Sequence, residues 1–256
     1  MVGELHGGHQ SRLYRARRTG GDYVAKLTER RFVDDAYFAR LDLAGRLAAI
    51  DSRVVGPLPI EGSLATAMGE WFVVAYPFVQ GRSADPTDRG DVTAMAATLA
   101  ELHDSMRTLD VAGLPRVAAL RDVTDGLGSG RPEQLLHGDY GASNIVVNDA
   151  GVRIIDFDDA GWGPVEFEIG NTLYMAMFDA TVRHDLDEYR RFREWFVDGY
   201  GVTAASAPEL DVVDAAITLR KRALANWLDD LPNAPIGVRS ASPEWRRLLR
   251  RFVNTP

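Results

Sequence analysis

The stretch LLHGDYGASNIVVNDAGVRIIDFDD, residues 135–159, carries most of what the sequence says about the fold and function of this 256-residue chain. It sets five aspartates, two asparagines and one histidine among short apolar runs. A carboxylate that leaves water needs a partner, so this many acids beside buried strands indicate a site that binds something. The residue types and their spacing predict what that is.

The second half of the stretch predicts a β-hairpin with oxygen-bearing side chains at its open end. The β-branched runs 146–147 and 154–155 supply the strands, and NDAG supplies the turn. Asn144 and Asp156 each lie six residues from the centre of that turn, and Asp139 lies five residues before Asn144. Oxygen ligands without nitrogen or sulfur suit Mg²⁺, which usually keeps waters and substrate phosphates as its other ligands.

The spacing also matches the phosphoryl-transfer arrangement of kinases. His137-Gly138-Asp139 is followed by Asn144, and Asp156-Phe157-Asp158 begins 12 residues later. In that arrangement one aspartate accepts the proton of the acceptor hydroxyl, while the asparagine and the later aspartate hold the metal. A loop that only caps a hairpin is the alternative. Both triplets in this order favour the kinase arrangement.

Composition narrows the class of protein. The chain has no cysteine, which excludes disulfides and thiolate sites. It has no signal-peptide pattern and no apolar run near the roughly 18 residues of a membrane span, so we expect a cytoplasmic protein without a membrane partner. The net charge is −8, with +1 over residues 1–80 and −9 over residues 81–256. An acidic second part argues against nucleic acid and suits a cationic ligand, although a solvated acidic surface would look the same.

Hydrophobic periodicity divides the chain into two parts. The first 80 residues read as strands around one helix, and the remainder reads as mainly helical. We therefore predict an α+β fold with a small β-rich nucleotide-binding lobe (1–80) and a larger, mainly helical catalytic and acceptor-binding lobe (81–256). The predicted strands cover 11–17, 22–28 and 70–82, and the predicted helices cover 34–50, 88–106, 166–180, 185–201, 209–231 and 243–254.

The segment HGDYGASNIVV…IIDFDDAGWGP resembles the aminoglycoside phosphotransferase family, kinase-like small-molecule phosphotransferases related to choline and homoserine kinases. GGHQSRLYRAR…YVAKL resembles the nucleotide loop, strands and lysine of that family. TLAELH (98–103) and PVEFEIGN (164–171) resemble the segments on either side of its catalytic loop. The resemblance implies a two-lobed, protein-kinase-like fold with ATP in the cleft.

The resemblance assigns roles to particular residues. Asp139 resembles the catalytic base, and Asn144 and Asp156 resemble the Mg²⁺ ligands. Lys26 resembles the strand lysine that contacts the α- and β-phosphates of ATP. Only two of the 29 basic residues are lysines, and a retained lysine is one that needs a compact point charge, which supports this assignment.

Three further features of the family have weaker counterparts. In the family, a glutamate on a helix pairs with the strand lysine. No glutamate of this chain matches it, and the nearest helical carboxylate is Asp42, with Asp35 second. Glu168 stands where the family usually has aspartate, and we expect it to hold the loop backbone. His137 is expected to brace the catalytic loop, and His103 to be a core histidine.

The nucleotide is expected to meet the backbone at two places. Gly7 and Gly8, in the loop HGGHQS (6–11), can offer backbone N–H groups to phosphates. The backbone around Tyr76 and Phe78, in VVAYPFVQG (73–81), lies where the hinge between the lobes should bind adenine. Pro77, between them, has no N–H to donate.

These features predict an ATP-dependent phosphotransferase that moves the γ-phosphate to a hydroxyl of a small molecule. The first acceptor candidate is a cationic one, an aminoglycoside or similar antibiotic, which the acids of DLDEY (185–189) and WLDD (227–230) would attract; it would give a role in antibiotic resistance. Homoserine, choline or a sugar-like metabolite are the alternatives. A protein kinase is the second hypothesis, but DFDDAGWGPVEFEIGN leaves no room for a long activation loop. A catalytically silent nucleotide-binding module is the third. The choice between ATP and GTP and the oligomeric state stay open.

Overall fold

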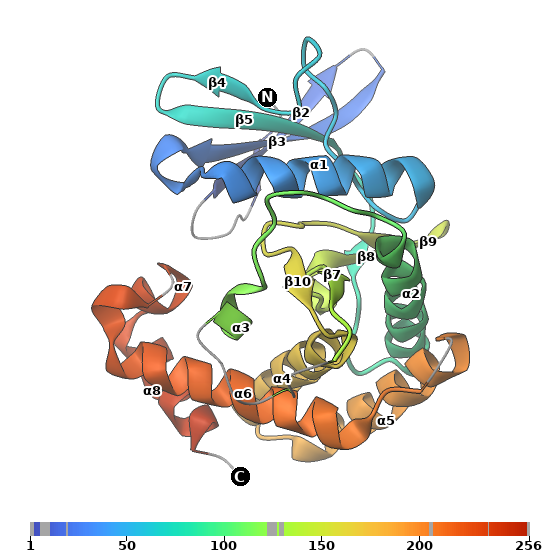
Figure 1. Cartoon of the computed structure of the whole chain (residues 1–256), viewed down its shortest axis with the longest axis vertical. Helices are drawn as coiled ribbons and strands as arrows, with labels where there is room; N and C mark the ends of the chain where they lie inside the picture. The colour runs from blue at the N-terminus through green and yellow to red at the C-terminus, as the bar shows by residue number, and fades with distance from the viewer. Residues whose placement is uncertain are drawn as a thin grey trace.

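The computed structural model describes residues 3–5, 11–18, 20–121, 127, 131–204, 207–234 and 236–254. A small lobe of sheet and one long helix lies above a larger lobe of helices (Figure 1). This arrangement confirms the predicted α+β class and its two lobes. The boundary between residues 80 and 81 stays a prediction, because one core runs from the helix of the small lobe into the large lobe.

The small lobe is built on a five-stranded antiparallel sheet in the order β1-β2-β3-β5-β4. Its strands are β1 (Gly3–Leu5), β2 (Ser11–Arg18), β3 (Gly21–Glu29), β4 (Thr66–Met68) and β5 (Trp71–Pro77). The strands predicted over 11–17 and 22–28 are confirmed. The strand predicted over 70–82 is too long at its end: β5 stops at Pro77, and β6 (Arg82–Ser83) pairs with the large lobe instead. Lys26 lies opposite Val74 in the middle strands of this sheet.

Helix α1 (Asp35–Ile50) confirms the helix predicted over 34–50. It begins at Asp34, whose carboxylate accepts a hydrogen bond from the backbone N–H of Tyr37 at 2.8 Å, as a good N-cap does. Tyr37 and Leu41 pack with Val74 of the sheet, whereas Leu47 joins the main core. Because α1 contacts both lobes, it fixes the position of the sheet above the large lobe.

The large lobe consists mainly of long helices (Figure 1), which pack around a main apolar core and a smaller cluster that includes Phe167 and Leu219. All five helices predicted after residue 80 are confirmed, to within a few residues at their ends. They are α2 (Arg89–Arg107), α4 (Val165–Arg183), α5 (Leu186–Thr203), α6 (Leu210–Asp229) and α8 (Pro243–Val253), with short α3 (Ala118–Arg121) and α7 (Ile236–Arg239) between them. No helix in the described ranges is long and apolar enough to cross a membrane.

Two small sheets lie between the lobes and hold the stretch that opened the sequence analysis. The predicted hairpin is confirmed as β8 (Ile145–Asn148) and β9 (Gly151–Ile154), and β6 pairs with β8. A second pair, β7 (Gln134–Leu136) with β10 (Gly161–Gly163), was not predicted. Since β7 runs into the first loop and β10 leaves the second, this pair brings residues 137–144 beside residues 155–160.

Candidate active site

Asp139 and Asn144 are in direct contact at the open end of the hairpin. The side-chain amide of Asn144 donates hydrogen bonds to Oδ2 of Asp139 at 3.0 Å and to its carbonyl oxygen at 2.8 Å. Asn144 faces Ile155, whose N–H donates to the Asn144 carbonyl at 3.0 Å, so Asp156 comes one residue later than predicted. The difference arises because the turn is centred between Asp149 and Ala150, half a residue before the expected point.

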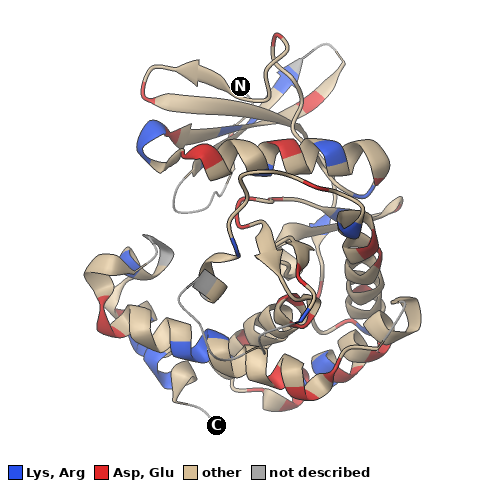
Figure 2. Ribbon diagram, viewed as in Figure 1, with Lys and Arg blue, Asp and Glu red and all other residues tan. Residues whose placement is uncertain are grey.

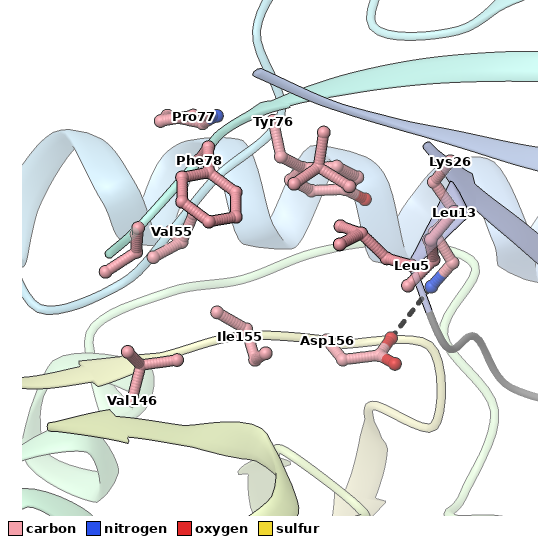
Figure 3. Close-up of a pocket in the computed structure, with 12 residues that line it drawn as sticks. Leu5, Leu13, Lys26, Val55, Tyr76, Pro77, Phe78, Val146, Ile155 and Asp156 are labelled. Atoms are coloured by element: carbon pink, nitrogen blue, oxygen red, sulfur yellow. Dashed lines mark hydrogen bonds and ion pairs between the residues drawn. The ribbon is translucent and has the colours of Figure 1, made fainter. Parts of the chain in front are cut away.

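Asp156 joins the large lobe to the small lobe. Its backbone is left-handed, with φ of 64°, a conformation that aspartate adopts more readily than most residues. Its Oδ1 lies 2.9 Å from Nζ of Lys26 on β3 (Figure 3). The structure thus brings together the predicted phosphate-binding lysine and a predicted metal ligand, residues that are 130 positions apart in the sequence.

Lys26 is a buried cation between two carboxylates. Its side chain is 9% exposed, and Nζ lies 2.6 Å from Oδ2 of Asp158 as well as 2.9 Å from Asp156. Burial alone would lower the pKa of Lys26, but the charges of Asp158 and Asp156 outweigh it and raise that pKa. Burial opposes the ionisation of Asp156, yet Lys26 holds the pKa of Asp156 below its usual value. One lysine facing two carboxylates leaves a negative charge that a divalent cation can neutralise.

Asp139 has the electrostatic environment of a general base. Burial raises its pKa to about 6, with a further contribution from the charge of Asp159, against the opposing effects of His137 and Asn144. A carboxyl group with that pKa is largely ionised at neutral pH and still holds a transferred proton well. Asp139 is therefore suited to take a proton from a hydroxyl group.

The backbone of the catalytic loop is held by Glu168 on α4. Its Oε2 accepts hydrogen bonds from the His137 N–H at 2.9 Å and from Nε2 of His103 at 3.1 Å, and its Oε1 accepts from the Gly138 N–H at 2.6 Å. The Glu168 side chain is completely buried, and His103 also contacts the Tyr200 hydroxyl at 2.8 Å. Burial opposes ionisation, but the hydrogen bond and the charge of His103 keep the pKa of Glu168 low. The expected role of Glu168 and the core position of His103 both agree with this geometry.

His137 and Gly138 fix the loop against the segment after the hairpin. Nε2 of His137 lies 3.0 Å from the Ile155 carbonyl, and its Nδ1 accepts from the Asp139 N–H at 3.3 Å. Gly138 has φ of +86°, and a Cβ there would lie 2.0 Å from the Asp159 carbonyl oxygen. Only glycine allows this close approach, which sets Asp139 beside the DFDD segment.

A cavity of about 260 Å³ lies between the lobes, with Lys26 and Asp156 at one end (Figure 3). Tyr76 and Phe78, the two predicted hinge residues, line it from the small lobe. Most of its wall is apolar, which suits a planar ring system such as a nucleobase. The other lining residues are Leu5, Leu13, Val24, Val55, Pro77, Val79, Val146 and Ile155.

The hinge backbone offers polar groups at particular positions. The Phe78 N–H is used by the sheet, since it donates to the Asp22 carbonyl at 2.9 Å. Pro77 faces Tyr23 at a position between such hydrogen bonds, so its carbonyl points away from β3. Among the described residues the structure shows no hydrogen bond to the Pro77 carbonyl or from the Val79 N–H, so both can serve a ligand although Pro77 has no N–H to donate.

One predicted nucleotide contact is not brought into the site, and another cannot be placed. Asp42 lies on the outer side of α1 and forms an ion pair with Arg46, one helical turn along, at 2.8 Å. The prediction that Asp42 replaces the helix glutamate therefore lacks support, because Lys26 takes both its carboxylate partners from the DFDD segment. Gly7 and Gly8 lie outside the described residues.

Arginine pairs with several carboxylates of the acidic clusters that were predicted to attract the acceptor. Asp229 pairs with Arg250 at 2.9 Å, and Glu188 pairs with Arg183. In the same clusters Asp187 pairs with Arg190, and Asp185 caps α5. Figure 2 shows basic residues gathered along α8, beside the end of α6 that carries Asp229. The Asp229–Arg250 pair joins α6 to α8 and the Glu188–Arg183 pair joins α4 to α5, whereas Asp230 accepts a hydrogen bond from the Asn233 side-chain amide at 2.9 Å. The prediction that these clusters attract a cationic acceptor stays a prediction.

The residues predicted to hold Mg²⁺ fit such an ion. The amide nitrogen of Asn144 is engaged with Asp139, and its Oδ1 accepts no hydrogen bond within the described ranges. Lys26 takes Oδ1 of Asp156, so Oδ2 lies outside that ion pair. These are two hard oxygen donors beside a negative cluster, a number that suits Mg²⁺ when phosphates and waters complete its shell.

Two contributors were missed by the sequence reasoning. Val55 follows α1 and reaches the cavity between the lobes by packing alongside β9, where its N–H donates to the Ile154 carbonyl at 2.9 Å. Nothing in the local sequence marks a single valine for this place. Arg40 on α1 donates a hydrogen bond to the Ala160 carbonyl at 3.0 Å. The sequence offers one hint of this contact, a basic residue on the helix where the family has the glutamate that pairs with the strand lysine.

Comparisons with known proteins agree with this geometry. The model of the phosphotransferase enzyme family matches residues 106–210, which include Asp139, Asn144, Asp156 and Glu168. No curated protein matches the sequence.

Several solved structures are similar over nearly the whole chain. An amicoumacin kinase in complex with AMP-PNP, Ca²⁺ and Ami has a TM-score of 0.78 and 16% identity, covering 98% of this chain and 86% of its own. A microcompartment-associated aminopropanol kinase has a TM-score of 0.74 and 17% identity, covering 99% and 89%. A thermostable mutant of an aminoglycoside phosphotransferase has a TM-score of 0.61 and 17% identity, covering 99% and 94%. The resemblance seen in the sequence is thereby confirmed: the segment with the catalytic loop matches the phosphotransferase enzyme family, and the chain has the two-lobed fold of aminoglycoside phosphotransferases and related kinases.

Proposed function

We propose that the protein is an ATP-dependent kinase that transfers the γ-phosphate to a hydroxyl group of a small molecule. One observation carries the proposal: the Lys26–Asp156 pair, at 2.9 Å, lines an apolar cavity, and the Asp139–Asn144 pair, at 3.0 Å, lies close enough that the charge of Asp156 helps to raise the pKa of Asp139. A loop kept only for folding would not need a buried lysine and a carboxyl group whose pKa is about 6.

The nucleotide would lie with its base in the apolar cavity and its phosphates toward Lys26. The Pro77 carbonyl and the Val79 N–H would meet the polar edge of adenine. Burial raises the pKa of Tyr76, so its phenol would stay neutral beside the adenine ring. Lys26 would contact the α- and β-phosphates, and the backbone of Gly7 and Gly8 would cover them.

The chemical step needs one base and one fixed geometry. The acceptor oxygen forms a bond to the γ-phosphorus, the bond from that phosphorus to the bridging oxygen breaks, and the hydroxyl proton passes to Oδ1 or Oδ2 of Asp139. Asn144 orients Asp139 through its amide, and Glu168 fixes the loop that carries it. When bound through Asn144 and Asp156, Mg²⁺ would supply the positive charge that neutralises the phosphate oxygens.

For the acceptor, we favour a hydroxylated amine, either a small amino alcohol or an aminoglycoside-like antibiotic. Since several acids of residues 185–189 and 227–230 pair with arginine or cap a helix, the support that we use comes from Asp159, near the proposed catalytic base Asp139. Its carboxylate is exposed, contributes to the raised pKa of Asp139, and has no ion pair in the described part of the chain. The names of two similar proteins, an aminopropanol kinase and an aminoglycoside phosphotransferase, denote substrates with amino and hydroxyl groups. Asp159→Asn should raise the acceptor KM with little change in the KM for ATP.

A screen of ADP release tests the proposal. The purified protein would be incubated with Mg-ATP and a panel of amino alcohols, aminoglycosides, other antibiotics, choline, homoserine and neutral polyols. We expect acceptor-dependent ADP release with at least one hydroxylated amine. Release only with a protein substrate would favour a protein kinase, and no release with any acceptor despite tight Mg-ATP binding would favour a silent nucleotide-binding module.

A further inference from the structure

The ion pairs of Lys26 differ from the arrangement that the family resemblance implies, in which a glutamate on the helix holds the strand lysine. Both of its carboxylate partners come from one short segment after β9, Asp156 at 2.9 Å and Asp158 at 2.6 Å. The shorter contact belongs to the third residue of the Asp-Phe-Asp triplet. Lys26 is buried, so it cannot exchange these partners for water without opening the cleft.

Helix α1, which is described throughout, has no carboxylate on the face that it turns toward Lys26. That face is formed by Tyr37, Leu41 and Ala44, all buried. The acids of the helix, Asp35 and Asp42, lie on its outer side, and Asp42 is held by Arg46. An apolar helix face against the sheet leaves no place for the acid that usually holds this lysine.

The same helix instead sends a cation to the segment that carries the acids. Nε of Arg40 donates to the Ala160 carbonyl at 3.0 Å, two residues after Asp158. Arg40, Asp156 and Asp158 line one small recess below Tyr76. In the family arrangement the helix contributes an acid to the lysine. Here α1 contributes a basic group, Arg40, and the segment after β9 contributes the acid, Asp158.

We propose that Asp158 is the positioning residue of Lys26 and takes the part of the absent helix glutamate. This inference rests on the proposed function, because it concerns how Lys26 is held for a nucleotide. Asp156 would share its carboxylate between Lys26, through Oδ1, and the metal, through Oδ2, so its charge would be divided between two cations. With Asp158 in place, Lys26 keeps one carboxylate and stays directed at the phosphates.

The proposal separates two roles that lie two residues apart. If Asp158 acts through Lys26, its removal matters only while Lys26 is present. If Asp158 were a metal ligand, its removal would raise the Mg²⁺ requirement whether or not Lys26 is present. A double-mutant cycle measures that difference directly.

The experiment is a titration of the full chain with AMP-PNP by calorimetry, at several Mg²⁺ concentrations. The variants are Asp158→Asn, Lys26→Met and the double variant, with Asp149→Asn in the exposed β8–β9 turn as the matched control. We expect Asp158→Asn to weaken AMP-PNP binding roughly tenfold, the size of one charge-assisted contact. In the Lys26→Met background the same change should weaken binding less than about twofold. Asp158→Glu should recover part of the loss, because it keeps the charge, and Asp149→Asn should bind like the wild type.

The outcomes separate the possible errors. An equal loss in both backgrounds, or a Mg²⁺ requirement that rises as it does for Asp156→Asn, would overturn the role of Asp158 while the kinase proposal stands. A wild-type chain that binds no Mg–AMP-PNP would overturn the proposed function and this inference with it. Circular dichroism melting of each variant shows whether a loss of binding comes from unfolding, in which case Asp158→Glu at the same site decides the matter.

Discussion

Replacing Glu168 with glutamine should loosen the catalytic loop without leaving a cavity. The carboxylate accepts three hydrogen bonds: from the N–H groups of His137 and Gly138, and from the ring of His103. Glutamine has one acceptor and one donor group in the same space. If its NH₂ takes the place of Oε1, it faces the Gly138 N–H, and if it takes the place of Oε2, it faces the His137 N–H.

The magnitude follows from that count. Either orientation leaves a buried main-chain N–H without an acceptor, which costs about 1–3 kcal/mol. The remaining hydrogen bonds also lose the charge of the carboxylate, which makes charge-assisted hydrogen bonds roughly twice as strong as neutral ones. We therefore expect Glu168→Gln to reduce the free energy of unfolding by about 2–4 kcal/mol and to lower kcat, since the loop that carries Asp139 is displaced.

The pH dependence has a definite sign. Because the pKa of Glu168 is depressed in the folded protein, the wild-type carboxylate stabilises the fold above its unfolded pKa of about 4.3, and this contribution is lost as the pH falls through the folded value. Glutamine does not titrate. The difference in stability between wild type and variant should therefore be largest near pH 7 and shrink below about pH 4.

Urea denaturation at pH 7 and at a pH below 4, followed by circular dichroism, measures both effects. Glu194→Gln is the matched control, because Glu194 is an exposed glutamate on α5, and its substitution should change the free energy of unfolding by less than about 0.5 kcal/mol. The reasoning is refuted if Glu168→Gln stays within about 0.5 kcal/mol of that control at pH 7.

Three further changes have definite expectations. Asp156→Asn should raise the Mg²⁺ concentration needed for AMP-PNP binding, while the fold persists because Lys26 keeps Asp158; unchanged Mg²⁺ dependence in calorimetry would contradict this. Gly138→Ala should lower the free energy of unfolding by about 1–3 kcal/mol, since its Cβ would lie 2.0 Å from a carbonyl oxygen, whereas Gly201→Ala, with open space around it, should be neutral or stabilising in urea denaturation. Chelation of Mg²⁺ with EDTA should abolish AMP-PNP binding in the same calorimeter, and binding that survives would remove the metal from the mechanism.

The elements that the sequence predicted well are those with strong local signals. The hairpin at 145–154 combines β-branched runs with a turn, and α1 begins at a capping aspartate, Asp34. Such signals need no knowledge of the rest of the fold. The strands β7 and β10 have three residues each, too few to show a period, although they bring the two catalytic segments together.

The site was harder to predict wherever a partner came from far away in the chain. Asp139 and Asn144 were found because their contact is set by five residues of loop. Asp42 was chosen as the partner of Lys26 by its distance along the sequence, whereas the fold supplies Asp158 from 132 residues later. In the same way, Asp229 looked free in the sequence and is held by Arg250 on another helix.

The most direct test of the account is a comparison of Asp139→Asn with the wild type in two measurements on the same preparation. Once the ADP-release screen has identified an acceptor, the transfer of γ-labelled phosphate to it and the affinity for Mg–AMP-PNP would both be measured. We expect the variant to bind the nucleotide within about threefold of the wild type and to lose at least about a hundredfold in turnover, in line with the usual contribution of a general base. A variant that keeps near-normal turnover, or that loses nucleotide affinity as strongly as turnover, would contradict the assignment of Asp139 as the base.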